Sequence, residues 1–275
     1  VPAALFYYSS AVHPPNGKSP RLRTSKVLAK IRDGRCARVV ALGHYLPFYI
    51  RYAAHHGFDA IWLDLEHRAM EGREVQSLLA MCHQFDIDAM VRAPTTERTL
   101  LYRYLEDGAA GLLMPLVADA AEARHIAQAV KFPPIGNRGL DGAGLDADFA
   151  LGGGDFTEDA NGETFVFAQI ETAQALANAE AIAAVEGIDG LFIGPADLGL
   201  RLGLVDGSPS LQEATAHIAD VARDHGKAWG IAGGGPAEWA TYRQMGAQML
   251  IGAGDFALTG VLAAAQKNFD EVFGE

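Results

Sequence analysis

The stretch EGIDGLFIG, residues 186–194, contains the signal that decides the fold. An acidic residue and a glycine end a helical segment, and a short apolar run follows at once. Apolar runs of this length, bounded by a turn signal, are typical of strands buried on both faces of a parallel sheet. Similar signals occur in HGFDAIW (56–62), DGAAGLLMP (107–115) and MGAQMLIG (245–252). The chain therefore repeats one unit of helix, turn and strand.

Eight apolar runs of this kind occur along the chain, and segments with helical spacing lie between them. Strand followed by helix, repeated eight times, predicts an α/β fold of the (β/α)8 TIM barrel type, with one extra helix, 26–33, before the first strand. The predicted strands are 38–43, 60–64, 88–92, 111–115, 165–171, 190–194, 228–232 and 248–252. The predicted helices include 74–84, 97–106, 120–130, 172–185, 211–225, 237–245 and 256–272.

We expect an N-terminal extension, residues 1–23, followed by a single barrel domain, residues 24–275. One connection breaks the repeat. Between the fourth and fifth strands, the segment 133–163 carries PPIGNRGLDGAG and LGGGD, and it is too long and too rich in glycine for an ordinary helical return. We expect this long loop after strand 4 to lie over the mouth of the barrel.

Composition limits the partners and the compartment. The formal net charge of −12 argues against nucleic acid and against an anionic membrane surface, because both need a basic protein surface. No apolar run approaches the ~20 residues that cross a bilayer. Cys36 and Cys82 are too few for a disulfide framework and lack CxxC spacing, so we expect a reducing, cytoplasmic location.

Polar side chains follow several of the predicted strands. Barrel enzymes carry their chemistry at the carboxyl ends of the strands, so these side chains are expected to meet at one mouth. They are Asp64, Glu66 and His67 after strand two, Arg92 after strand three, Gln169 and Glu171 after strand five, and Gly194, Pro195, Ala196 and Asp197 after strand six.

Glu171 and Asp197 come from adjacent strands, whose axes lie about 4.8 Å apart in a sheet. Two carboxylates at that separation can share one hard divalent cation, with water or substrate oxygens completing an octahedral shell. Two alternatives remain open from the residues alone. The pair can form a salt bridge with Arg92, or each carboxylate can cap the helix that follows it.

Arg92 ends an apolar strand and presents a planar fork that suits a substrate carboxylate. Its alternative role is an internal ion pair with Glu171 or Asp64. Schiff-base chemistry needs a lysine on a strand that faces the mouth, yet none of the lysines, Lys18, Lys26, Lys30, Lys131, Lys227 and Lys267, is placed there. Carbonyl activation is therefore expected from a metal ion acting as a Lewis acid, without a Schiff-base lysine.

Seven segments resemble the HpcH/HpaI aldolases, the metal-dependent class II pyruvate aldolases of the pyruvate/phosphoenolpyruvate barrel type. The match runs in family order over nearly the whole chain from about Val39, and it leaves out the N-terminal extension and an insert at 144–162. The matching segments are FDAIWLDLEH, MVRAPT, LEDGAAGLLMPLV, KFPPIGNRGL, FAQIET, VEGIDGLFIGPADL and GAQMLIGAGD.

The resemblance implies that Glu171 and Asp197 bind Mg2+, Mn2+ or Co2+ and that Arg92 together with the metal holds pyruvate. The resemblance also implies that backbone amides around Gly194–Asp197 bind the pyruvate carboxylate. These amides would lie at a helix N-terminus, which is a common anion-binding site. Gln169 is placed with these substrate-binding residues.

His67 resembles the family histidine that moves the proton through a metal-bound water. Relatives brace this histidine with an Asp at the end of helix three, a position that holds Glu106 here, with Asp107 beside it. Glu66 is expected to orient a metal-bound water. Asp64 either lines the aldehyde side or holds Arg92 or the loop after its strand.

Two departures from the family pattern affect the substrate. The frequent Ser of the GPSD motif is Ala196, which removes a hydroxyl and leaves the amides. Where relatives place a Leu that crowds the aldehyde, this chain has Ala232 followed by Gly233. We therefore expect a roomier acceptor pocket around Ala232.

The resemblance implies an aldehyde-lyase (EC 4.1.2.-) that reversibly cleaves a 4-hydroxy-2-oxo acid into pyruvate, or a similar 2-oxo acid, and an aldehyde through a metal-stabilised enolate. One alternative is an acyl-CoA lyase similar to citrate lyase β or malyl-CoA lyase, although no basic cluster for the CoA phosphates is visible near the mouth. Another is a non-catalytic barrel that binds a small acid.

Partners are expected to be the 2-oxo acid and the aldehyde, with no nucleic acid and no membrane. The resemblance also implies a homohexamer, a trimer of dimers, in which the last helix packs on a neighbour. The apolar face of the last helix, 256–272, fits such an exchange, and it fits closure of its own barrel equally well.

Overall fold

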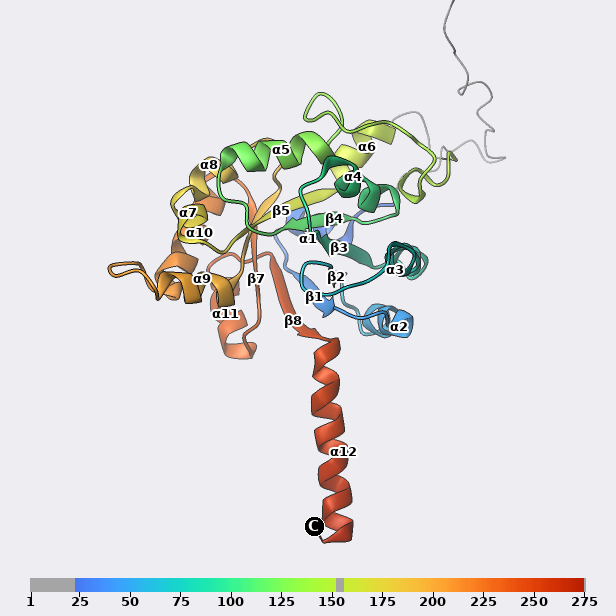
Figure 1. Ribbon diagram of the computed structural model, residues 1–275, viewed down its shortest axis with the longest axis vertical. Coiled ribbons are helices and arrows are strands. Elements are labelled where there is room, and N and C mark those ends of the chain that lie inside the picture. The colour runs from blue at the N-terminus through green and yellow to red at the C-terminus, as the bar shows by residue number, and fades with distance from the viewer. Residues whose placement is uncertain (1–22, 152–155, 275) are drawn as a thin grey trace, which may run out of the picture.

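The computed structural model describes residues 23–151 and 156–274, and these form a closed barrel of eight parallel strands (Figure 1). Each strand pairs with the next strand in the chain, and β8 pairs with β1. The prediction of a (β/α)8 barrel is confirmed. The strands are β1 Ala37–Leu42, β2 Ala60–Asp64, β3 Asp88–Arg92, β4 Gly111–Met114, β5 Phe165–Ile170, β6 Gly190–Ile193, β7 Ala228–Ala232 and β8 Met249–Gly254.

Helices surround the barrel, and most of them begin and end close to the predicted positions. The predicted helix 172–185 is divided in two at Asn178, and the helix after β6 begins at Pro195. The helices are α1 Lys26–Arg32, α2 Pro47–His55, α3 Gly72–Gln84, α4 Arg98–Glu106, α5 Ala120–Val130, α6 Phe156–Glu163, α7 Ala173–Ala177, α8 Ala179–Ala183, α9 Pro195–Leu202, α10 Leu211–Asp224, α11 Pro236–Gln244 and α12 Leu258–Phe273. Two short 3-10 helices are η1 Leu145–Ala147 and η2 Asp255–Ala257.

Large aromatic side chains fill the interior of the barrel. Phe165 and Phe167 of β5 are fully buried and lie opposite Gly111 of β4 and Gly190 of β6 in the strand registers. A Cβ atom at either glycine would lie 2.3 Å from the facing phenyl ring. The glycines are therefore needed for ring packing, and the packed interior leaves only the two ends of the barrel for polar groups.

The N-terminal end of the barrel is closed by the segment that leads into α1. The carboxylate of Asp88, at the start of β3, is fully buried and accepts hydrogen bonds from Ser25 Oγ at 2.7 Å and from the Val27 amide at 2.9 Å. Arg23 Nη1 lies 2.9 Å from the same carboxylate. This network joins α1 to the sheet and belongs to the stabilising end of the fold. The rest of the predicted extension, residues 1–22, lies outside the described residues.

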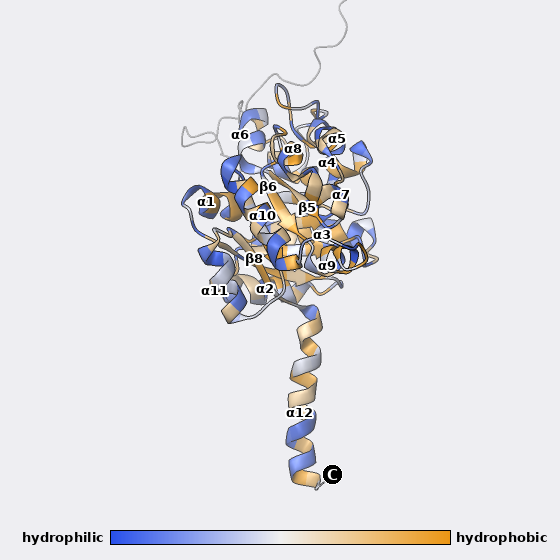
Figure 2. Ribbon diagram, turned by 90° about the vertical axis from the view of Figure 1, so that its left-hand side faces the viewer, coloured by the Kyte–Doolittle hydropathy of each residue, from blue (hydrophilic) through white to orange (hydrophobic). Residues whose placement is uncertain are grey.

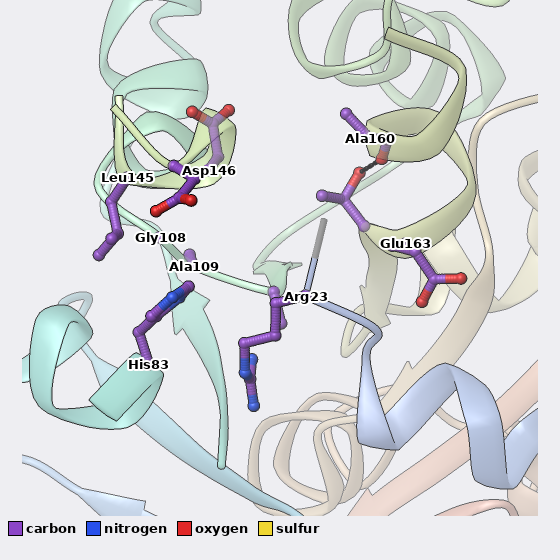
Figure 3. Close-up of a pocket in the computed structure, with 11 residues that line it drawn as sticks. Arg23, His83, Gly108, Ala109, Leu145, Asp146, Ala160 and Glu163 are labelled. Carbon is purple, nitrogen blue, oxygen red and sulfur yellow. Dashed lines mark hydrogen bonds between the residues drawn. The ribbon is translucent and has the colours of Figure 1, made fainter. Parts of the chain in front are cut away.

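The described residues of the long segment between β4 and β5, 133–151 and 156–163, do not cover the mouth, so that prediction was wrong for them. The helix α5 first returns the chain to the N-terminal end, where Lys131 Nζ donates to Thr164 O at 2.6 Å and lies 3.1 Å from Asp189 Oδ2, just before β5 and β6. Leu145 and Asp146 of η1 line a cavity of about 220 Å³ there (Figure 3). The helix predicted at 120–130 already returns the chain to this end of the barrel, so the glycine-rich segment that follows it lies here and not at the mouth. The described insert residues are 144–151 and 156–162.

The helix α12 stands away from the barrel, as Figures 1 and 2 show from two sides. None of its residues is buried, and its apolar side chains, Leu258, Val261, Leu262, Phe269, Val272 and Phe273, are all exposed. The chain therefore does not use α12 to close its own barrel. Within residues 23–151 and 156–274, no helix combines the length and the apolar character needed to cross a membrane.

Candidate active site

The carboxyl ends of β2 and β3 bring Asp64 and Arg92 together, because these two residues are paired in the strand register. Arg92 Nη2 lies 2.8 Å from Asp64 Oδ2, and Nε donates to Oδ1 at 3.0 Å. The guanidinium also lies over the ring of Trp62, 4.6 Å from its centroid, and Arg92 is only 7% exposed. The internal ion pair between Arg92 and Asp64, one of the two open alternatives, is therefore present.

Arg92 lowers the pKa of the Asp64 carboxyl. Burial acts to raise the pKa of Asp64, but the hydrogen bond and the charge of Arg92 outweigh it, so the pKa lies below the usual aspartate value. Arg92 Nη1 lies 3.1 Å from Glu66 Oε2. One guanidinium thus faces two carboxylates from the end of β2, and Asp64 fixes its orientation.

Glu171, directly after β5, is 3% exposed, and both of its carboxylate oxygens accept hydrogen bonds. Leu116 N donates to Oε1 at 2.7 Å, and Gln169 Nε2 donates to Oε2 at 2.6 Å. Leu116 has φ +56°, a left-handed backbone conformation that is uncommon for leucine. The cap of α7 is Thr172, so Glu171 is not a helix cap.

Negative charge gathers around Glu171. Burial raises the pKa of this carboxyl, the Leu116 amide lowers it, and the charges of Glu66 and Asp197 raise it further, with a net shift above the usual glutamate value. Burial and the two neighbouring carboxylates therefore disfavour the ionised form of Glu171. A bound cation would relieve the repulsion between these carboxylates.

Asp197 lies in the first turn of α9, and the N-cap of that helix is Gly194, so the predicted capping alternative for Asp197 is not observed. A Cβ atom at Gly194 would lie 2.7 Å from Gln169 Nε2 and 2.9 Å from Glu171 Oε2. Glycine is therefore required for the end of β6 to approach the end of β5. Pro195 has no N–H, so the amides that α9 can offer an anion are those of Ala196 and Asp197.

The donor set at this mouth fits a hard divalent cation. No group of three or more His, Cys, Asp and Glu side chains in the described part of the chain is arranged as a complete metal site. Glu171 and Asp197 supply two carboxylates, and the buried Gln169 Oε1 has no hydrogen-bond partner among the described residues. Ions that keep several waters need only one or two protein carboxylates.

His67 follows Glu66 in the loop after β2, and its side chain is 56% exposed. Its Nε2 lies 3.7 Å from Glu66 Oε2, and its backbone amide donates to Asp64 Oδ1 at 3.3 Å. Among the described residues, Glu66 is therefore the carboxylate that lies within 4 Å of the His67 ring. Glu106 and Asp107, where a brace for His67 was expected, are not brought to it. Asp107 instead accepts a hydrogen bond from Gln76 at 2.9 Å.

Comparison with known proteins decides the family. A family model described as HpcH/HpaI aldolase/citrate lyase matches residues 44–258. The chain belongs to this family. It is 34% identical to a hydroxypyruvate/pyruvate aldolase of Pseudomonas aeruginosa over an alignment of 213 residues. This alignment covers 76% of the chain and 79% of the relative. It is 39% identical to a 4-hydroxy-2-oxovalerate aldolase of Rhodococcus jostii over 178 residues, and this alignment covers 64% of the chain and 68% of the relative.

The fold agrees with this assignment. The crystal structure of an HpcH/HpaI aldolase from Desulfitobacterium hafniense superposes with a TM-score of 0.82 at 30% identity, covering 88% of this chain and 96% of that one. The family relationship identifies the chain as an enzyme of the aldolase/lyase type. The predicted resemblance to HpcH/HpaI aldolases is confirmed.

Three features of this HpcH/HpaI mouth were not found from the sequence. Leu116 acts through its backbone amide, which has no sequence signature. Arg201 lies one helical turn after Asp197, a spacing that could have been noticed. His44 Nδ1 lies 2.7 Å from Oδ2 of the buried Asp255. These residues follow β1 and β8, so their position at strand ends is the signal that points to them.

The described lysines lie away from the carboxylate cluster of the HpcH/HpaI site. Lys26 and Lys30 pair with Asp86 and Asp59, which precede β3 and β2. Lys131 and Lys227 bind backbone oxygens before β5 and β6, and Lys267 lies on α12. Lys18 is outside the described residues.

Proposed function

We propose that this HpcH/HpaI protein is a class II, metal-dependent pyruvate aldolase. It would reversibly cleave a 4-hydroxy-2-oxo acid into pyruvate, or a similar 2-oxo acid, and an aldehyde. The observation that carries the proposal is the meeting of Glu171 and Asp197 at one mouth with the buried, oriented guanidinium of Arg92. Two relatives bear names of this reaction class, hydroxypyruvate/pyruvate aldolase and 4-hydroxy-2-oxovalerate aldolase.

Glu171 and Asp197 would hold Mg2+, Mn2+ or Co2+. When bound, such an ion supplies Lewis acidity that makes the protons next to a keto group easier to remove. The chain prepares Glu171 for this role before any ligand arrives, because the Leu116 amide and Gln169 Nε2 orient its two oxygens. Preorganised ligands lower the cost of binding an ion.

Arg92 would bind the carboxylate of the 2-oxo acid. Asp64 occupies Nε and Nη2, so the substrate would meet the Nη1 side, where Glu66 now lies 3.1 Å away. The amides of Ala196 and Asp197 at the start of α9 would complete the anion site. Gln169 Oε1, buried without a partner among the described residues, would accept a hydrogen bond from a bound water.

His67 would move the proton. Its exposed ring lies at the rim of the mouth, and Nε2 is close enough to Glu66 for a small rotation to form a hydrogen bond. In the cleavage direction a base must take the proton of the 4-hydroxyl group. In the reverse direction, when the enolate adds to the aldehyde, the same group returns the proton. Glu66 would therefore link the proton carrier His67 to the substrate-binding Arg92.

The test is cleavage of 4-hydroxy-2-oxo acids of increasing chain length, followed as pyruvate release. We expect release that stops on chelation and returns with Mg2+, Mn2+ or Co2+, and no covalent adduct after borohydride with pyruvate. His67→Gln should lower kcat strongly, whereas His125→Gln, an exposed histidine on α5, should not. A trapped lysine adduct would overturn the class II assignment.

A second candidate is cleavage of a carbon–carbon bond in an acyl-CoA substrate whose thioester stays intact. The matching family model covers citrate lyases as well as aldolases. The two functions differ in the group next to the cleaved bond. Metal-dependent cleavage of the carbon–carbon bond in malyl-CoA or citryl-CoA, without cleavage of free 4-hydroxy-2-oxo acids, would favour the lyase.

We also propose that the chain assembles as a homo-oligomer in which α12 packs on a neighbouring copy. The support is that α12 carries a row of exposed apolar side chains and leaves its own barrel uncovered beside β8 (Figure 1). A hexamer, as a trimer of dimers, is the form that the resemblance implies. Light scattering of the purified protein tests it, and a stable monomer at micromolar concentration would contradict it.

A further inference from the structure

We propose that Arg201 is an internal counter-ion that competes with the divalent cation for Asp197 and so weakens metal binding. This inference rests on the proposed metal site. Arg201 lies in the last turn of α9, one turn after Asp197, and Nη2 is 3.3 Å from Asp197 Oδ1. The guanidinium therefore occupies one side of a carboxylate that the cation needs.

Arg201 contacts both proposed metal-binding residues. Its Nη1 donates to the backbone oxygen of Glu171 at 2.7 Å, at the point where β5 leaves the barrel. An ordinary pair between residues four apart on a helix joins only two side chains and is flexible. Here the second contact, to the Glu171 backbone, also fixes the guanidinium relative to the end of β5, so its positive charge has a defined place beside the carboxylates.

Two opposite effects follow from this position. The two contacts hold the α9 helix against the residue that follows β5, which favours metal binding. The positive charge of Arg201 repels any cation on Asp197, which disfavours metal binding. The first effect is largely duplicated, because the Leu116 amide and Gln169 Nε2 already orient Glu171 without Arg201. The repulsion between Arg201 and the cation comes from Arg201 itself, so removing Arg201 removes it. Metal binding should therefore become stronger.

Exposure sets the scale of the effect. The side chains of Arg201 and Asp197 are 37% and 43% exposed, so solvent and salt screen the charge without removing it. Loss of one screened positive charge beside a divalent ion should tighten binding by about threefold to tenfold. The same screening predicts that the difference between variant and natural protein shrinks as salt is added.

The experiment measures Mn2+ affinity by titration calorimetry and by electron paramagnetic resonance, without substrate. Arg201→Gln and Arg201→Met remove the charge, and Arg201→Lys keeps it without the planar fork. The matched control is Arg223→Gln, because Arg223 pairs with Asp220 on the outer helix α10 at 2.7 Å and its loss changes net charge equally.

We expect tighter Mn2+ binding in both neutral variants, near-natural affinity in Arg201→Lys and Arg223→Gln, and convergence of all curves at high salt. Unchanged or weaker binding in folded neutral variants would overturn the counter-ion role and leave Arg201 as a clamp. Equal tightening in Arg223→Gln would show a general charge effect and would also overturn it. Absence of Mn2+ binding to the natural protein would reject the proposed metal site itself, and the inference with it.

Discussion

The guanidinium of Arg92 meets the carboxylate of Asp64 through two nitrogens, at 2.8 and 3.0 Å, across the paired ends of β3 and β2. Both side chains are nearly buried, and the ring of Trp62 supports the guanidinium from one face. The Arg92 guanidinium, which would bind the substrate carboxylate, is thus oriented before the substrate arrives. This orientation lowers the entropy cost of substrate binding. Asp64 has a positioning role in this arrangement.

Arg92→Lys should keep metal binding and lose binding of the 2-oxo acid. Lysine keeps the charge but cannot engage Asp64 with two nitrogens and still reach a ligand, so we expect pyruvate affinity to fall at least about tenfold. Calorimetry with Mn2+ and then pyruvate separates the two steps. Arg103→Lys, an exposed residue of α4, serves as control, and an equal loss there would contradict the role of Arg92.

Metal binding should depend on pH through Glu171. The folded protein holds the pKa of this carboxyl above its usual value, chiefly by burial, and the ion needs the ionised form. Protons therefore compete as the pH falls through that raised pKa, above the ordinary glutamate value of about 4.3. We expect Mn2+ affinity to weaken with a midpoint above that value and Glu171→Gln to abolish binding. A midpoint at the ordinary value would contradict the burial argument.

The strands could be predicted because a barrel strand is buried on both faces and reads as a short apolar run. The ends of β2 and β3 were predicted to the residue, at Asp64 and Arg92. The division of the predicted helix 172–185 could not be seen, because it depends on a tertiary contact. Asn178 lies at the break and donates from Nδ2 to the Ala118 carbonyl at 2.9 Å.

The site was predictable where function rests on a side chain at a strand end. This rule singled out Arg92, Gln169 and Glu171, which the structure places at the carboxyl ends of β3 and β5, with β4 between them. It could not find the Leu116 amide, because nearly every residue offers a backbone amide. It also could not find the contact of Arg201 with the Glu171 carbonyl, because this contact joins α9 to the residue after β5 only in the folded protein.

Gly190→Ala should destabilise the barrel. The added Cβ would lie 2.3 Å from Cε1 of the buried Phe167, so the ring or the strand must move, at a cost of about 1–3 kcal/mol or more. Urea denaturation measures the change. Phe167→Leu in the same chain should recover part of the loss. Gly162→Ala, in α6 with open space around it, should be neutral or slightly stabilising. Equal effects at both glycines would contradict the packing argument.

Ala232→Leu should narrow the range of aldehydes. Ala232 ends β7 and is half-buried, and the glycines that follow it, Gly233 and Gly234, have φ +84° and +80°. A larger side chain there should lower kcat/KM for bulky aldehydes by about tenfold or more and spare small ones, in line with the cost of a misfitting group. An unchanged ratio of rates for bulky and small aldehydes would remove Ala232 from the acceptor pocket.

This mouth, loaded with a divalent ion, should make the methyl protons of pyruvate removable. The most direct measurement is exchange of those protons for deuterium in heavy water, followed by proton magnetic resonance without any aldehyde. We predict exchange that needs the ion, stops on chelation, and is lost in Glu171→Gln and strongly slowed in His67→Gln. Pyruvate that binds in the presence of the ion but shows no exchange above the enzyme-free rate would contradict the account.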